Sequence, residues 1–153
     1  MFTAAGIVLF RKFSNDFKCI YLVDQKGLDV RKGHKDDNES NIECAIRETY
    51  EEASILQESI KLLKKDMTLV QASPGLTEES LVQHDNGKLV CFVGITDSEP
   101  VVGVNPETGL KEHSECGWVS MEKMMSGCHD YLSSILFKSK KSIDKFRKSN
   151  VNI

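Results

Sequence analysis

The chain has 153 residues, of which 40% are hydrophobic and 28% charged, and its formal net charge is −3. These values suit a single globular domain spanning 1–153, long enough to bury a core, and they do not fit a disordered chain. The negative balance argues against a dominant nucleic-acid-binding surface. The sequence has no apolar run of roughly 18 residues or more, so no membrane span and no membrane partner are expected.

The cysteines and the first residues bear on the cellular compartment. Five cysteines are widely spaced and form no C-x-x-C pair, which argues against a disulfide framework or a zinc site. The opening MFTAAGIVLFRK lacks the basic region that precedes a signal sequence. We expect reduced thiols in the cytoplasm, with Cys19 and Cys91 as small core residues.

The N-terminal third predicts strands that lead to a glycine. Residues 3–10 and 18–24 are rich in β-branched and aromatic side chains and predict two strands with a polar turn at 11–17 between them. Gln25-Lys26-Gly27 predicts a further turn, and 28–32 a short strand that ends at Gly33. Glycine at that point allows an unusual backbone conformation or a close approach.

Residues 41–53, NIECAIRETYEEA, predict a helix. The segment contains no glycine or proline, and Asn38 and Ser40 are candidate N-caps. At about 100° per residue, the apolar residues gather on one side, and we expect Tyr50 to join the core there. Tyr21 and Trp118, elsewhere in the chain, are also expected in the core.

The opposite side of this helix carries three carboxylates within about one turn. They are Glu48, Glu51 and Glu52. Like charges at i and i+4 cost roughly 0.2–0.5 kcal/mol in an isolated helix, so the cluster is unfavourable without a cation. Mg²⁺ binds through a few carboxylates together with substrate phosphates. The simpler alternative for an isolated cluster of this kind is a solvated acidic face.

The remainder of the chain predicts strands followed by helices. Residues 57–65 are amphipathic but weakly defined, and 73–87 predict a loop that ends in a hairpin turn at 85–87. Strands are expected at 67–72, 88–96 and 115–120, a loop at 97–111, a helix from Met121 capped by Ser120, and a final helix over 129–148. This order of elements predicts the α+β class, as an α/β/α sandwich.

The spacing between Gly33 and Ile55 resembles the signature of the Nudix hydrolases, G-x5-E-x7-R-E-U-x-E-E-x-G-U, in which U is a bulky apolar residue. The matching positions are Gly33, Glu39, Arg47, Glu48, Glu51, Glu52 and Ile55. Thr49 and Ser54 depart from the pattern, since they stand where an apolar residue and a glycine are usual. The added glycine, glutamate and arginine at the right offsets favour a metal site over a solvated face.

The resemblance implies a fold, a reaction and a metal site. The fold is a mixed sheet between helices, with the signature forming a catalytic loop-helix-loop. The reaction is metal-dependent hydrolysis of a nucleoside diphosphate linked to another moiety, in which water attacks a phosphorus. By position, Glu48 and Glu52 are the leading ligands of Mg²⁺ (or Mn²⁺), Glu51 assists, and the backbone carbonyl of Gly33 adds to the set.

Further roles follow from the same resemblance. Arg47 is expected to orient the glutamates, with Glu39 as its partner. Glu52 and Glu112 are both candidates for the general base, with Glu115 behind them, and Glu51 belongs to the catalytic group.

Four basic residues lie close to these positions in the sequence. Lys32, Arg31 and His34 are candidates for binding the substrate phosphates, and for each the alternative is ordinary surface charge or structure. His113 could bond a phosphate or anchor its loop.

Several stretches narrow the resemblance to one branch of the family. The opening AAGIVLFRK, the tripeptide from Lys32 to His34, Glu112-His113 and Trp118 are similar to the asymmetrical diadenosine tetraphosphate hydrolases. The stretch 28–31 departs from them, because Trp and Pro are common there. Dinucleoside polyphosphates are therefore the first expected substrates, followed by ADP-ribose, dinucleotides of the NAD and FAD type, and 5′-capped RNA. A catalytically silent nucleotide sensor is the alternative of another class, and a homodimer is left open.

Overall fold

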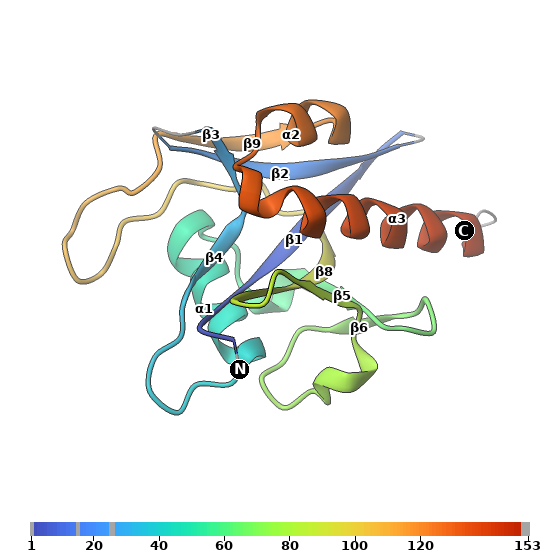
Figure 1. The fold of residues 1–153 in the computed structure, drawn as a ribbon, viewed down its shortest axis with the longest axis horizontal. Coiled ribbons are helices and arrows are strands. Elements are labelled where there is room, and N and C mark those ends of the chain that lie inside the picture. Colours follow the sequence, from blue (N-terminus) through green and yellow to red (C-terminus); the bar gives the residue numbers. More distant parts are fainter. Residues whose placement is uncertain (1, 15, 25–26, 151–153) are drawn as a thin grey trace.

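The structure is a computed structural model that describes residues 2–14, 16–24 and 27–150, with the side chain of Arg31 outside the description. A twisted sheet runs through the molecule with helices on both faces (Figure 1). The strands of the described part are β1 (Ala4–Phe13), β2 (Asp16–Asp24), β3 (Gly27–Asp29), β4 (Arg31–His34), β5 (Ile60–Leu63), β6 (Leu69–Gln71), β7 (Gln83–Asp85), β8 (Leu89–Thr96) and β9 (Glu115–Val119). The helices are α1 (Asn41–Ala53), α2 (Met121–Gly127) and α3 (Ser133–Ser149), with short 3₁₀ turns at Gln57–Ser59, Glu78–Ser80 and Asp130–Leu132.

The sheet is mixed, with β1 at its centre. The strand order is β3-β2-β1-β8-β5-β6, and β4, β7 and β9 pair with β1, β8 and β2 respectively. β1 and β8 are parallel, with Ile7 opposite Phe92, whereas β1 pairs with β2 and β4 in antiparallel fashion. The predicted α+β class with a mixed sheet is confirmed.

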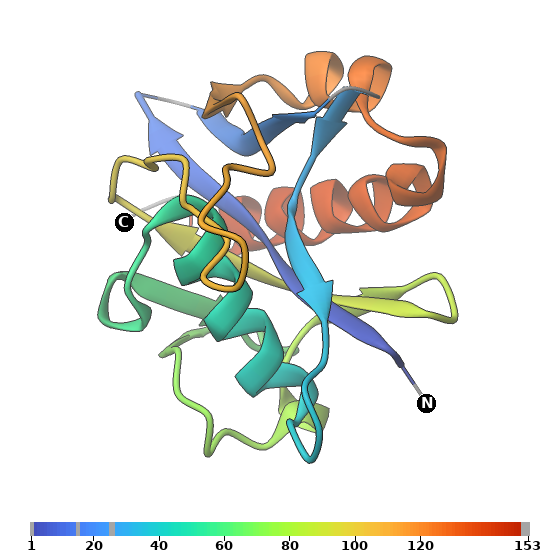
Figure 2. The same cartoon turned by 90° about the vertical axis from the view of Figure 1, so that its left-hand side faces the viewer.

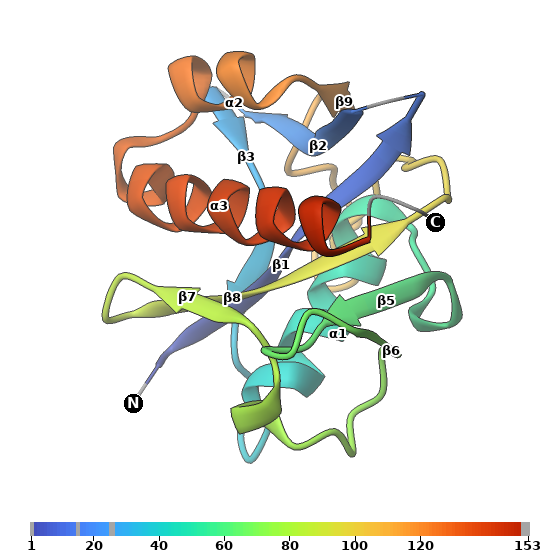
Figure 3. The same cartoon turned by 90° about the vertical axis from the view of Figure 1, so that its right-hand side faces the viewer.

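Alternation along β1 divides the core into two layers. Val8 and Phe10 point toward α2 and α3, while Ile7 and Leu9 point toward α1. All four side chains are fully buried, and each contributes about 1.5–3 kcal/mol relative to exposure. Figure 2 views the molecule from the side of α1, and Figure 3 shows α3 lying across the other face of the sheet. The predicted α/β/α sandwich is therefore present.

Helix α1 is capped at both ends by serine residues. Ser40 is the N-cap: its side chain accepts the Glu43 backbone N–H at 3.1 Å, and the Glu43 side chain accepts the Ser40 N–H at 3.0 Å. This reciprocal capping box satisfies two backbone donors. The helix ends at Ser54, which adopts φ 60° and donates its N–H to the carbonyl of Tyr50 at 2.8 Å. The expected loop-helix-loop is thereby formed.

Several expected elements differ from the structure. The predicted turn at 11–17 is mostly strand, because β1 and β2 continue to pair down to Phe13 opposite Asp16. Residues 57–65 form a 3₁₀ turn and β5 instead of one amphipathic segment, since pairing with β8 buries Ile60 and Leu62 completely. The last helix starts at Ser133, after a separate 3₁₀ turn.

Two further expectations have different outcomes. Tyr50 is 55% exposed instead of buried, because the sheet covers only the part of this side of α1 that carries Ala45 and Ala53, which are fully buried. The hairpin turn at 85–87 is confirmed, with Gly87 at φ +94° donating its N–H to the Asp85 carboxylate. Gln25 and Lys26 of the predicted turn lie outside the described residues. Within the described ranges, no helix is long and apolar enough to cross a membrane.

Candidate metal centre and phosphate pocket

The contact between β4 and α1 builds one wall of the candidate site. Gly33 lies on β4 opposite Ala5 of β1, and a Cβ atom added at Gly33 would overlap the Glu48 carboxylate. Only glycine allows the strand and this carboxylate to approach so closely. The Gly33 carbonyl accepts the thiol of Cys44 at 3.3 Å. Gly33 therefore positions Glu48, one of the predicted metal ligands.

Glu52 is the most buried carboxylate of the group. It is 8% exposed, and its Oε2 accepts the Lys32 backbone N–H at 3.2 Å. Burial raises the pKa of Glu52 to about 9, and the negative charge of Glu48 adds to the effect, while Lys32 opposes it. A buried carboxylate with so little positive compensation is one that a bound cation would stabilise.

Glu48 and Glu51 share one arginine. Arg47 Nη1 donates to Glu48 Oε1 at 2.8 Å and to Glu51 Oε2 at 2.9 Å. Burial raises the pKa of Glu48, and Arg47 opposes this shift. The arginine thus fixes the direction of both carboxylates on α1.

The predicted partner of this arginine is also present. Arg47 Nε and Nη2 donate to the two oxygens of Glu39 at 2.7 and 2.9 Å, and Nη2 also donates to the His34 carbonyl at 2.9 Å. The fork of the guanidinium matches a carboxylate in this way. These bonds hold the pKa of Glu39 below its ordinary value. The loop between β4 and α1 is thereby tied to the helix that carries the acidic cluster.

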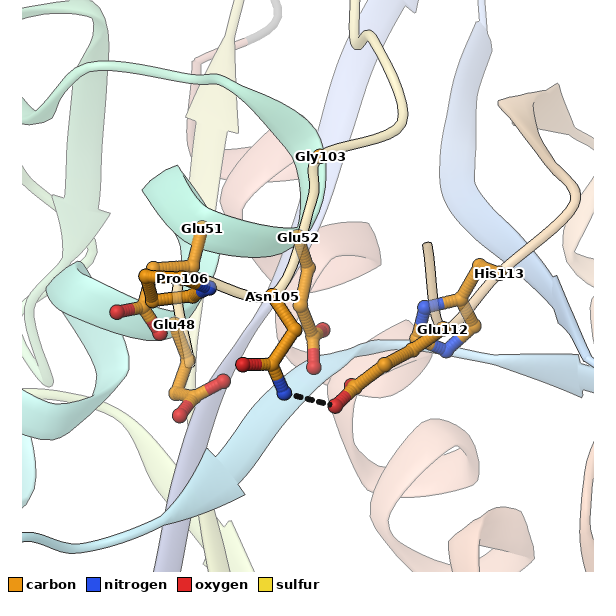
Figure 4. A pocket seen from close by; sticks show the side chains of 8 residues that line it. All are labelled: Glu48, Glu51, Glu52, Gly103, Asn105, Pro106, Glu112 and His113. Atoms are coloured by element: carbon orange, nitrogen blue, oxygen red, sulfur yellow. Dashed lines mark hydrogen bonds between the residues drawn. The ribbon is translucent and has the colours of Figure 1, made fainter. Parts of the chain in front are cut away.

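The long loop after β8 closes the second wall. The Gly103 N–H donates to the carbonyl of Glu52 at 2.9 Å, and a Cβ at Gly103 would overlap the carbonyl of Glu51. Asn105 Nδ2 donates to Glu112 Oε1 at 2.7 Å. Figure 4 shows the carboxylates of Glu48, Glu52 and Glu112 directed into the space around the Asn105 amide.

The pocket between these walls is strongly acidic. Its volume is about 490 Å³, and its described lining contains eight acidic residues against one lysine, one arginine and two histidines, which are Lys32, Arg47, His34 and His113. The acidic lining is Asp24, Asp29, Asp36, Glu48, Glu51, Glu52, Glu107 and Glu112. Ligand atoms of Glu52, Glu112 and His113 lie within 4.8 Å of one another. A polyphosphate can enter such a pocket only with cations that offset the charge of the carboxylates.

The basic residues expected near the phosphates have different surroundings. The Lys32 ammonium lies 3.1 Å from Asp29 Oδ2 and 5.7 Å from the centre of the Tyr131 ring. His34 is exposed and lines the pocket. Arg31 begins β4, but its side chain lies outside the described part of the structure. His113 is buried, with Nε2 3.4 Å from Asp29 Oδ2.

Glu115 has another environment from the glutamates above. It lies on β9 and accepts the Tyr21 hydroxyl at 2.9 Å. This contact ties β9 to β2, and Glu115 is not among the described residues that line the pocket.

Several residues of the pocket were not foreseen from the sequence, and two of them hold other side chains in place. Asp29 is 3% exposed and contacts both Lys32 and His113, and Asn105 holds Glu112. Asp29 left one signal, namely a carboxylate between Leu28 and Val30 in a short strand. The sequence gives no such signal for Asn105, because its loop is far from α1 in the sequence and reaches it only in the folded chain.

Comparison with known proteins agrees with this geometry. The family model of the NUDIX domain matches residues 2–136. No curated protein gives a significant match. Three solved structures illustrate the similarity of fold.

An Ap4A hydrolase from C. elegans in a binary complex is 20% identical with a TM-score of 0.69, covering 93% of this chain and 98% of its own. A Nudix hydrolase from Listeria monocytogenes is 20% identical with a TM-score of 0.67, covering 95% of each chain. The NUDIX domain of NrtR from Shewanella oneidensis, complexed with ADP ribose, is 11% identical with a TM-score of 0.57, covering 94% of this chain and 88% of its own.

The family model spans most of the sequence, and the structure carries the mixed sheet, the loop-helix-loop and the acidic helix face at the expected places. The chain belongs to the Nudix family of pyrophosphohydrolases.

Proposed function

We propose that this chain hydrolyses dinucleoside polyphosphates with Mg²⁺ or Mn²⁺ bound at the acidic face of α1. Nudix enzymes act on nucleotide substrates and use a divalent metal. The observation that carries the proposal is the buried Glu52 carboxylate, which opens with Glu48 and Glu112 into a pocket of about 490 Å³. The cytoplasm remains the expected compartment.

The residues at the site fit a hard divalent cation. Mg²⁺ and Mn²⁺ prefer oxygen ligands, and the pocket offers carboxylates rather than thiolates. The proposed ligands are Glu48, Glu51, Glu52 and the backbone carbonyl of Gly33. A divalent ion held by these residues would offset the charge of the phosphates and would make a bound water more acidic.

The protein residues then bind, orient and accept a proton. Arg47, held by Glu39, keeps Glu48 and Glu51 in position. Glu52 and Glu112 are the candidates to accept the proton of the attacking water, and Asn105 fixes Glu112. Hydrolysis of an anhydride depends mainly on such positioning and on charge neutralisation.

Basic side chains at the pocket are proposed to bind the substrate phosphates. Lys32 and His34 line the pocket, and Arg31 begins the same strand. A lysine offers a compact charge and three donors to phosphate oxygens. Together they would hold the part of the polyphosphate that the metal does not reach.

The substrate class is proposed on similarity to known proteins. The stretches that resemble the diadenosine tetraphosphate hydrolases agree with the fold of the C. elegans Ap4A hydrolase. The ADP ribose bound to the Shewanella NUDIX domain makes ADP-ribose the second candidate. NAD, FAD and capped RNA complete the set, and a silent nucleotide sensor is the alternative of another class.

A substrate panel tests this proposal. Diadenosine tetraphosphate, ADP-ribose, NAD and capped RNA would be incubated with Mg²⁺, and the nucleotide products separated by chromatography. We expect turnover that is fastest on diadenosine tetraphosphate and that falls about a hundredfold or more in Glu52→Gln. Glu112→Gln, compared with Glu52→Gln across the pH range, shows which carboxylate acts as base. Nucleotide binding without turnover on any substrate would instead identify a sensor.

A further inference from the structure

We propose that Asp29 is a positioning residue that holds the Lys32 ammonium away from Glu52 and so keeps the Glu52 carboxylate available to the metal. This inference rests on the proposed metal site. It assigns a role to a residue outside the signature stretch.

Lys32 lies between two buried carboxylates. Its backbone N–H donates to Glu52 Oε2 at 3.2 Å, while its ammonium lies 3.1 Å from Asp29 Oδ2. The positive charge of Lys32 opposes the upward shift of the Glu52 pKa. The backbone of Lys32 is therefore bound to Glu52, while its side-chain ammonium is bound to Asp29.

The surroundings of Asp29 hold its carboxylate in place beside the Lys32 ammonium. Its Oδ1 accepts the Val30 N–H at 2.8 Å, and its Oδ2 faces both Lys32 Nζ and His113 Nε2. The carboxylate is 3% exposed, and an opposite charge so close to a buried group interacts more strongly than at the surface. The Tyr131 ring, 5.7 Å from the Lys32 ammonium, lies on the same side and supports this position.

Without the Asp29 charge, the ammonium would turn to the other carboxylate within its reach. The flexible stem of lysine allows this movement. Glu52 is buried and forms no ion pair with any side chain that the structure describes, so an ammonium there would be favourable. A lysine bound to Glu52 would then compete directly with the divalent ion.

A double-mutant cycle on Mn²⁺ affinity tests the proposal. The variants are Asp29→Asn, Lys32→Met and the pair, and bound Mn²⁺ is measured by electron paramagnetic resonance without substrate. We expect Asp29→Asn to weaken Mn²⁺ binding by about tenfold. Lys32→Met alone should change it by less than about threefold, but should restore most of the loss in the Asp29→Asn background.

A simple loss of negative field gives another pattern. In that case Lys32→Met would improve Mn²⁺ binding by the same factor in both backgrounds, and this additive result would overturn the proposal. Asp24→Asn is the charge-matched control, since Asp24 lines the same pocket and bonds His129 at 3.1 Å. A loss in Asp24→Asn as large as in Asp29→Asn would also contradict a specific role.

Two arrangements keep the outcome clear. If Asp29→Asn does not fold, Asp29→Ser replaces it in the same cycle, because serine keeps an oxygen near the Val30 N–H. If the unmodified protein fails to bind Mn²⁺, the proposed metal site itself is wrong. If it binds Mn²⁺ and the cycle is additive, only the role of Asp29 fails.

Discussion

At the residue scale, the site depends on one close approach between a strand and a helix. Gly33 leaves room for the Glu48 carboxylate where any Cβ would overlap it. Gly33→Ala should push this carboxylate aside and destabilise the fold by about 1–3 kcal/mol. We expect metal-dependent turnover to fall about 10- to 100-fold.

A matched glycine separates the two effects of this change. Gly75→Ala adds the same methyl group where the nearest heavy atom beyond the adjacent residues, Ser73 Oγ, is 4.0 Å away. It should leave turnover unchanged, and the free energy of unfolding should stay within about 0.5 kcal/mol of that of the unmodified protein. If Gly33→Ala hydrolysed the substrate as fast as the unmodified protein, Glu48 would not need its close approach to Gly33.

Ser54 stands where the family pattern has glycine, in a left-handed conformation with φ 60°. Ser54→Gly should relieve about 1 kcal/mol of backbone strain and lose a hydrogen bond of similar size, the 3.1 Å contact from Oγ to the Val101 carbonyl. The free energy of unfolding should therefore change little, and activity should be retained. Ser54→Ala keeps the strain and loses the bond, so it should unfold in less urea. A large loss of activity in Ser54→Gly would assign the serine a specific role.

At the element scale, α1 and the loop before it are joined through Arg47 and Glu39. The pKa of Glu39 is lowered in the folded state, chiefly by its bonds from Arg47. The stabilisation by ionised Glu39 is thus present above its ordinary pKa and is lost as the pH falls through the lower folded pKa.

Glu39→Gln should consequently destabilise the protein by about 1–2 kcal/mol at pH 7. The difference from the unmodified protein should shrink as the pH is lowered below about 4.5. Urea unfolding at several pH values measures this, with Glu58→Gln as a control at an exposed position. A difference that stays constant down to pH 3 would mean that the ion pair is not its cause.

The helices and strands around the site differ in how well the sequence predicts them. The spacing within α1 is local, so Ser40, Arg47 and the three glutamates could be placed before the structure was known. The sandwich followed from the order of elements. By contrast, β5 is a short apolar run that the pattern alone does not distinguish from a helix, and pairing with β8 decides it.

Contacts between residues far apart in the sequence explain why the roles of Asp29 and Tyr50 were not predicted. Asp29 meets His113 across 84 positions of sequence, and no local pattern reports such a distance. Tyr50 lies on the apolar side of the helical wheel, but the sheet covers only part of that side. Burial of a helix face is thus set by its neighbours as well as by its own pattern.

At the scale of the whole molecule, acidic residues gather beside α1 and basic residues gather on α3, on the other face of the sheet. The described lining of the pocket beside α1 has eight acidic residues against one lysine, one arginine and two histidines, whereas α3 on the other face carries six basic residues and one acidic residue. Binding of Mg²⁺ should stabilise the folded state by about 2.7 kcal/mol at a hundredfold excess over Kd. The melting temperature should rise by roughly 5–10 °C.

Thermal unfolding in Mg²⁺ and in EDTA at equal ionic strength measures this shift. Glu52→Gln is the control, and its melting temperature should respond much less to Mg²⁺. A similar response in both proteins would indicate a general ionic effect.

The most direct test of the metal centre is the anomalous scattering of Mn²⁺ in crystals soaked with the ion. We predict a peak about 2.0–2.3 Å from carboxylate oxygens of Glu48 and Glu52 on α1, and its loss in Glu52→Gln. A peak instead at Asp24 and His129, or none in crystals of a protein that still hydrolyses its substrate, would contradict the assignment of these glutamates as metal ligands.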